Sequence, residues 1–517
     1  MTRAINAEIS ATWRYHEATK HSYASVRSHQ GGLDWANRPR PFKIYPALDP
    51  FPLPREFPAA DAEALHSGQS IPSSLPQGEA PALEQLAALL HFSAGITRRR
   101  IYAGGELYFH AAACTGALYE IELYLVAAQI DRLPAGVYHF SPADFALRRL
   151  RSGDWRGVLV AAAAAEPAVA RAPISIISTG TYWRNAWKYG ARTYRHFGWD
   201  NGTILANLLA MAAAHRLQPR LVLGFQDAPV NRLLDLDEGK EVALSIVALG
   251  DSDPAPETDP EIPALGLEVI PPSRREVDFP AMRAMHAATR LAGAAEVASW
   301  RGALPAAPQQ EVAGAVVALG PAQDAPAGPA LEAVIARRGS TRRFARKPIT
   351  LAELAASLDR ATGVIPADFL DPPGAPLNDI YLIANAVVGL EPGSYALHRR
   401  PLRLELLRRG SFRQEARHLA LDQDLAGDAA ADVFFLADLN RILGRFGNRG
   451  YRAAQLEAGI LGGRLYLAAY AQQFGATGLT FYDDEVVEFF SPHAAGRSAI
   501  FLIALGRSAE RLPLARE

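Results

Sequence analysis

Apolar and polar positions along this chain follow spacings that predict a mixture of helices and strands. Residues 82–90 repeat apolar side chains every three to four positions, which is typical of an amphipathic helix. Residues 121–127 and 137–140 are short apolar runs around a Leu-Pro-Ala-Gly turn and predict two strands. Residues 203–215 are apolar nearly all round, so they predict a buried helix. Similar patterns predict strands at 172–178 and 242–250 and helices at 15–22 and from Leu351 onward.

The pattern of the first half returns in the second. A displacement of 257 residues superposes Lys-Tyr-Gly-Ala-Arg-Thr-Tyr-Arg (188–195) on Arg-Phe-Gly-Asn-Arg-Gly-Tyr-Arg (445–452). The same displacement takes Gly202 to Gly459 and Asp227 to Asp484. Chance seldom preserves Gly, Arg and aromatic positions over such a span without gaps, so the sequence predicts a tandem duplication of one domain.

The predicted fold class is α+β, with two domains that each hold an antiparallel-rich mixed sheet flanked by helices. We place the first domain at 1–250 with an N-terminal arm at 1–80, and the second at 331–517. A Pro- and Ala-rich linker at 251–330 divides them. Duplicated domains usually pack as a pseudo-symmetric dimer, here through helices at 203–215 and 460–472. Two independent domains on a string are the alternative.

Composition narrows the functional classes. The chain has 517 residues, of which 49% are hydrophobic and 21% charged, as in an ordinary globular protein. A net charge of −1 argues against nucleic acid or a membrane surface as a partner. The single cysteine, Cys114, excludes an internal disulfide and a cysteine-rich metal site, and no metal is predicted. Without a stretch that resembles a signal peptide or a membrane span, we expect a cytoplasmic protein.

Residues 337–344, Arg-Arg-Gly-Ser-Thr-Arg-Arg-Phe, hold four arginines and two hydroxyls before an amphipathic helix. A guanidinium group offers paired donors that match phosphate oxygens, and hydroxyls can bind the remaining acceptors. A solvated basic turn is the alternative. A second segment, Cys-Thr-Gly-Ala-Leu-Tyr-Glu-Ile-Glu-Leu-Tyr (114–124), has small residues that let a ligand approach the backbone closely. Cys114 could be a reactive thiol or a packed small hydrophobe.

These segments, with 188–195, resemble the nitroreductase-like FMN flavoprotein superfamily and within it the SagB/ThcOx-type dehydrogenases. The resemblance implies one FMN at the interface of two domains. It assigns the phosphate to Arg338, Ser340 and Arg342, assisted by Arg507 or Arg511. It places Thr115, Gly116 and Ala117 under the flavin ring, and Thr480 and Phe481 beside the edge of that ring. Cys114 stands where the family usually has Ser, and Glu120 where it has Pro.

The two halves are unequal under this resemblance. The second half has Pro-Gly-Ala-Pro-Leu (373–377) in place of the flavin segment, and Arg445-Phe446 in place of Lys188-Tyr189. The first half opens with Lys20-His21-Ser22, a weaker phosphate cradle, although its loop at 223–225 is the more typical one. We therefore expect one complete FMN site and one degenerate site.

The SagB-type resemblance implies oxidation of an azoline ring to an azole on a peptide. Lys188 and Tyr189 are the predicted catalytic residues, with Tyr189 as acid/base group and Lys188 lowering its pKa or stabilising negative charge. The substrate is a small molecule or a peptide. An NAD(P)H-dependent nitro or quinone reductase and a catalytically inactive binding scaffold are the alternatives. As an intramolecular pseudo-dimer, the chain could act as a monomer.

Overall fold

The computed structural model describes residues 5–28, 32–60, 62, 80–102, 105–257, 261–305, 312–320, 328–371 and 376–509. Within this part, two seven-stranded antiparallel sheets form, one from each half. In spatial order, the first consists of β1 (Pro50–Pro52), β6 (Ala146–Ser152), β5 (Gly136–Ser141), β4 (Ile121–Ala127), β7 (Ile174–Thr181), β9 (Glu241–Leu249) and β8 (Arg220–Val222). The second consists of β10 (Val316–Ala318), β15 (Leu402–Arg409), β14 (Gly393–Arg399), β12 (Asn378–Ala384), β16 (Ala431–Ala437), β18 (Ser498–Gly506) and β17 (Gly475–Leu479).

The sheets share one topology, which confirms the predicted pair of α+β units. Helices repeat in the same way: α6 (Tyr182–Tyr189) and α7 (Thr193–Ala214) correspond to α15 (Leu439–Phe446) and α16 (Arg449–Ala471). The predicted buried helices are confirmed but are longer than predicted, because polar residues at their N-terminal ends are also buried. Other helices used below are α3 (Leu83–Ala94), α8 (Asp227–Leu233), α11 (Leu331–Arg337), α12 (Leu351–Ala361) and α17 (Asp483–Phe490).

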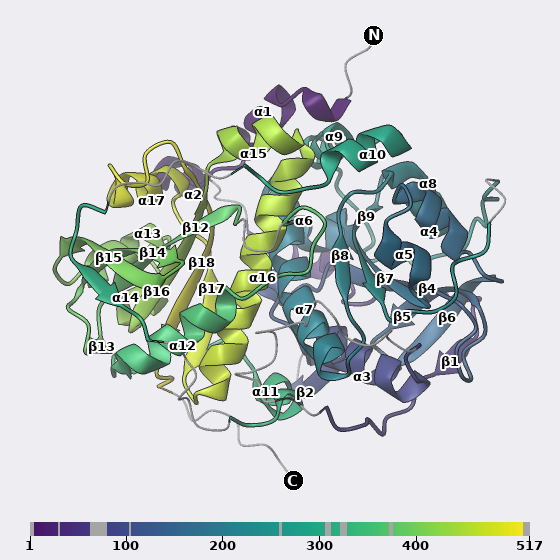
Figure 1. Cartoon of the computed structure of the whole chain (residues 1–517), viewed down its shortest axis with the longest axis horizontal. Coiled ribbons are helices and arrows are strands. Elements are labelled where there is room, and N and C mark those ends of the chain that lie inside the picture. Colours follow the sequence, from purple (N-terminus) through teal and green to yellow (C-terminus); the bar gives the residue numbers. More distant parts are fainter. Residues whose placement is uncertain are drawn as a thin grey trace.

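Helices α7 and α16 lie side by side between the two sheets (Figure 1). They approach so closely that a Cβ atom at Gly202 would lie 2.5 Å from Gly459 Cα. One turn to either side, a Cβ at Gly198 would meet Gln455 at 2.4 Å, and one at Gly463 would meet Ala206 at 2.6 Å. Each contact joins a residue to its own counterpart 257 positions later, as an isologous interface requires. The pseudo-two-fold axis therefore passes through the glycine crossing.

Reciprocal buried ion pairs surround this crossing. Arg449 and Arg452 of α16 bind Asp227 at 2.6 and 2.9 Å. In return, Arg192 and Arg195 of the first half bind Asp483 at 2.9 and 2.5 Å. Asp483, the first residue of α17, is thus the counterpart of Asp227, the first residue of α8. The displacement of 257 residues predicts Asp484 as the counterpart of Asp227. This prediction is wrong by one residue, because the loop after β17 is shorter than the loop after β8.

The N-terminal arm crosses to the second half. Helix α1 (Ser10–Ala18) begins and ends earlier than predicted, and it follows a short 3-10 helix at Ile5–Ala7. Thr12 donates a hydrogen bond to Asn448 Oδ1 at 2.6 Å, and Asn6 Oδ1 accepts one from Arg449 N at 2.7 Å. Residues 5–18 therefore cover the start of α16.

The segment predicted as a linker carries defined structure: α9 (Pro280–Ala288), α10 (Ala294–Trp300) and β10, the edge strand of the second sheet. The boundaries 1–250, 251–330 and 331–517 stay a prediction. None of the helices in the described ranges is long and apolar enough to cross a membrane.

We predict that Gly202→Ala destabilises the fold by about 2–3 kcal/mol, because the added methyl group overpacks the crossing. Urea unfolding measures the change. Gly444→Ala, at an exposed position of α15, is the matched control, since a Cβ there meets nothing within 4 Å. The control should gain roughly 0.5–1 kcal/mol, as expected when alanine replaces a helical glycine. Equal effects of the two substitutions would contradict the close crossing.

Candidate active site

The loop before β4 has an unusual backbone. Gly116, Ala117 and Tyr119 have φ angles of 66°, 53° and 52°, and for the two non-glycine residues this conformation costs free energy. Asp200 of α7 anchors the loop, accepting hydrogen bonds from Thr115 N and Thr115 Oγ1 at 2.9 Å. The strained loop is therefore held by side chains of its own half.

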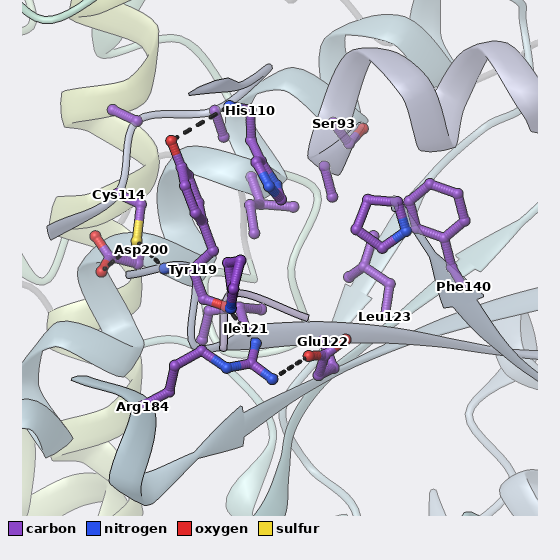
Figure 2. A pocket seen from close by; sticks show the side chains of 16 residues that line it. Ser93, His110, Cys114, Tyr119, Ile121, Glu122, Leu123, Phe140, Arg184 and Asp200 are labelled. Carbon is purple, nitrogen blue, oxygen red and sulfur yellow. Dashed lines mark hydrogen bonds and ion pairs between the residues drawn. The ribbon is translucent and has the colours of Figure 1, made fainter. Parts of the chain in front are cut away.

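Further contacts fix the far end of this loop. Arg184 donates to the carbonyl oxygen of Tyr119 at 2.5 Å and pairs with Glu122 at 2.6 Å. The Tyr119 ring stacks on His110, with centroids 3.7 Å apart (Figure 2). The cavity behind them has a volume of about 30 Å³, which is room for water but not for a substrate.

A buried acid cluster lies directly beneath the loop. Cys114 Sγ donates to Glu120 at 3.3 Å and to Asp200 at 3.4 Å. Burial, followed by the nearby Glu120 carboxylate, raises the pKa of Asp200 well above its usual range, so the Asp200 carboxyl group keeps its proton to higher pH. Burial also raises the pKa of Cys114 well above its ordinary value, which favours a packed thiol over a reactive thiolate.

Lys188 and Tyr189 end helix α6 above the same loop. A Cβ at Gly116 would lie 2.7 Å from the Tyr189 hydroxyl, so the phenol oxygen rests on the glycine. The Lys188 ammonium group lies 5.0 Å from the centre of the Tyr189 ring. The chain then turns sharply at Gly190, whose φ is 54°.

The electrostatics of this pair differ from the prediction. Burial, followed by the charges of Asp200, Cys114 and Glu120, raises the pKa of Tyr189 far above its ordinary value. The prediction that Lys188 lowers that pKa is therefore wrong, because the ammonium group lies over the ring while the carboxyl cluster lies beneath the hydroxyl. Burial, then Arg342, then Arg38, lowers the pKa of Lys188 itself.

The arginine segment after α11 reaches this site from the second half. Arg338 donates to the carbonyl oxygens of His110 and Ala111 at 2.8 and 2.9 Å, so two of its nitrogens join the halves. Ser340 Oγ lies 3.2 Å from the Tyr466 hydroxyl. Arg342 is exposed, and its charge acts on both Lys188 and Tyr189. The structure thus brings the two predicted half-sites together.

The loop after β17 approaches the same region. Tyr466 accepts a hydrogen bond from Gly478 N at 2.6 Å, which ties this strand to the arginine segment. Thr480 Oγ1 is buried and has no partner among the described residues. The ring of Phe481 is fully buried against Trp199, so only the main chain of Phe481 could contact a ligand.

Three predicted phosphate contacts are placed elsewhere or not described. Arg507 pairs with Glu353 of α12 at 2.6 Å. Arg511 lies outside the described residues. Lys20 pairs with Glu17 and Asp484, each at 2.8 Å, and the cradle at Lys20-His21-Ser22 stays a prediction.

Asp200 is the functional residue that sequence reasoning missed. A signal was present, because the displacement of 257 takes it to another acidic residue, Glu457. Glu457 Oε2 accepts from the backbone N–H groups of Leu377 and Asn378 at 2.9 and 2.8 Å. An acidic residue on the long helix therefore anchors the equivalent loop in both halves.

The N-terminal arm and the linker border the mouth of the site. Trp187 Nε1 donates to Asp34 O at 3.1 Å, and Trp183 Nε1 donates to Ser273 Oγ at 2.8 Å. Ser273 in turn donates to Asn37 O at 3.0 Å. These contacts bring exposed Arg38 beside Lys188.

The chain is thus a pseudo-two-fold α+β unit, with a basic, tyrosine-containing site between its halves. The model of the Nitroreductase family matches residues 335–491. A protein of Methanocaldococcus jannaschii is 29% identical over 168 residues, which cover 32% of this chain and 80% of that protein. A crystal structure from Anabaena variabilis superposes with a TM-score of 0.77 and 27% identity, covering 96% of this chain and 99% of the other. Both relatives carry the name "putative nitroreductase".

Residues 335–491 therefore match the Nitroreductase family, and the whole chain is similar in fold to a putative nitroreductase; these similarities indicate an oxidoreductase enzyme.

We predict that Asp200→Asn flattens the alkaline loss of stability. Because the pKa of Asp200 is raised in the folded state, its stabilising contribution is complete below the unfolded pKa and is lost as pH rises through the folded value. An amide at this position cannot ionise and can still accept from Thr115. Melting temperatures between about pH 5 and pH 9 should therefore fall less steeply in the variant.

Glu415→Gln, at an exposed carboxylate, is the control and should leave the pH dependence unchanged. A pH slope of Asp200→Asn that matches wild type would contradict the raised pKa of Asp200.

Proposed function

We propose that this chain is an FMN-dependent dehydrogenase of the SagB/ThcOx type that oxidises an azoline ring in a peptide to an azole. One observation carries the proposal. The Tyr189 hydroxyl lies on Gly116 and the Lys188 ammonium group lies over the Tyr189 ring, close to Arg342 from the other half. An amine, a phenol and an exposed guanidinium group therefore converge on one loop whose small residues leave the backbone accessible.

The described residues fit an FMN between the halves. Exposed Arg342 and the Ser340 hydroxyl supply donors suited to a phosphate. The buried Thr480 hydroxyl has no partner among the described residues, which a ligand would provide. Bound FMN would supply the hydride acceptor.

Lys188 is the better candidate for the base. Oxidation of an azoline removes a proton from one ring atom and a hydride from the neighbouring one, so the protein must accept the proton. Burial and two nearby positive charges lower the pKa of Lys188, which increases the share of free amine near neutral pH. The amine nitrogen can then take the proton from carbon.

Tyr189 would act as a hydrogen-bond donor. Its raised pKa keeps the phenol protonated over the whole working pH range. A protonated hydroxyl can donate to a ring heteroatom and orient the ring, and it is poorly suited to remove a proton. The acid cluster beneath Gly116 maintains this state by opposing a negative charge on the phenol oxygen.

An NAD(P)H-dependent nitro or quinone reductase is the second candidate, because the names of both relatives favour it. Rapid bleaching of the protein-bound flavin by NAD(P)H, with no turnover of an azoline peptide, would select this reaction.

We predict that the purified chain is yellow and holds about one FMN. Arg342→Ala should weaken FMN binding by about 10- to 100-fold, since a hydrogen bond to a charged group contributes roughly 1.5–3 kcal/mol. Fluorescence titration of apoprotein measures the affinity. Arg346→Ala is the matched control, because this exposed arginine lies two residues beyond the segment and pairs with Asp428. Colourless protein that ignores added FMN would refute the proposal.

We predict that kcat/KM for an azoline peptide rises with pH as Lys188 loses its proton. Arg38→Gln removes one of the charges that lower the pKa of Lys188, so the rising limb should move to higher pH. Arg40→Gln, at an exposed neighbour, should not move it. Lys188→Gln should abolish the limb. If Arg38→Gln moves the limb to lower pH or leaves it in place, Lys188 is not the base.

A further inference from the structure

The degenerate site has a loop whose amide groups are already bound. After β8, Leu223 N and Gly224 N donate to the two oxygens of Asp368 at 2.9 and 2.8 Å. Asp368 is fully buried and lies in the segment that follows α12. At the equivalent loop after β17, the Thr480 hydroxyl has no partner among the described residues. In the loop after β8, a side chain of the second half therefore already binds the donors. In the loop after β17, the Thr480 hydroxyl could still bind a ligand.

An indole ring fills the space in front of this loop. Trp300, the last residue of α10, is buried, and a Cβ at Gly224 would lie 3.2 Å from its ring. Its other neighbours are Phe446, with ring centroids 5.2 Å apart, and Phe369, at 6.3 Å. The indole N–H donates to Phe446 O at 2.9 Å. Because Phe446 is the counterpart of Tyr189, the indole lies between the same two elements that border the complete site.

The cation of the degenerate site is also bound by the linker. Arg445, the counterpart of Lys188, donates to the carbonyl oxygens of Ser299 and Arg301. Arg301 lies 3.4 Å from Glu166 and 3.9 Å from Asp368. The remaining opening of the degenerate site is a surface pocket of about 380 Å³ between α10, α15 and residues 6–9.

We propose that residues 294–304 and Asp368 occupy the second pseudo-symmetric site as an internal ligand, with the Trp300 indole in place of a planar cofactor ring. The proposal rests on the proposed function only for the identity of the ring that the indole replaces. It gives the linker a role, because the same segment that connects the halves also completes the core of this second site. A single chain would then bind one flavin at most.

Hydrogen exchange of the wild-type chain tests the internal ligand directly. We expect the amide groups of Leu223 and Gly224 to exchange at least about 10-fold more slowly than those of Thr480 and Phe481 in the apoprotein. Saturating FMN should slow exchange only at Thr480 and Phe481. Slower exchange at Leu223 and Gly224 on FMN addition would overturn the inference. If FMN changes neither loop, the proposed function fails while the internal ligand stands.

Removing the indole supplies the second test. Trp300→Gly should lower the melting temperature by roughly 5 °C and open a slot for a planar ring. In the presence of saturating FMN, equilibrium dialysis should show about one additional lumiflavin per Trp300→Gly chain and none on wild type. Trp199→Gly, which removes an equally buried indole beside the helix crossing, should bind none. A folded Trp300→Gly chain that binds no more lumiflavin than wild type would refute the proposal. Should this variant not fold, the exchange experiment decides alone.

Discussion

The whole architecture depends on the contact between Gly202 and Gly459. Only residues without a side chain let two helices approach so closely, and this approach brings each half within reach of the other's loops. If the helices were further apart, Arg338 could not reach the carbonyl oxygens of His110 and Ala111, which join the two half-sites. The site between the halves is thus a consequence of helix packing.

The four arginines around the crossing fix the position of the two helices relative to each other. Each aspartate, Asp227 or Asp483, receives two guanidinium groups from the opposite half and is fully enclosed. Such buried pairs contribute little net stability compared with apolar packing, but losing one partner costs about 3–5 kcal/mol. A sliding or rotated arrangement of the helices would leave these charges unpaired, so the ion pairs exclude alternative packings.

Local patterns in the sequence predicted the repeated elements well, because α7, α16 and the central strands are formed by long apolar runs. The duplication also predicted which segments of the two halves would meet. Contacts that depend on the path of irregular chain were not predictable. Nothing in the spacing of Trp300 or Asp368 indicates that they fill the counterpart of the active site. Likewise, the pKa of Tyr189 depends on Asp200, which is close in space but belongs to a different segment from the loop at 114–119.

The hydrogen bonds of Thr12 and Asn6 to the start of α16 have a consequence for how the molecule forms. Their partners, Asn448 and Arg449, follow more than four hundred residues later in the chain. During synthesis Asn6 and Thr12 leave the ribosome well before Asn448 and Arg449, so these hydrogen bonds can form only after the chain between them has been made. Closure of the arm is therefore a late event in assembly, and it depends on contacts of very large sequence separation, which form slowly. The arm can therefore bind only after both halves have been synthesised.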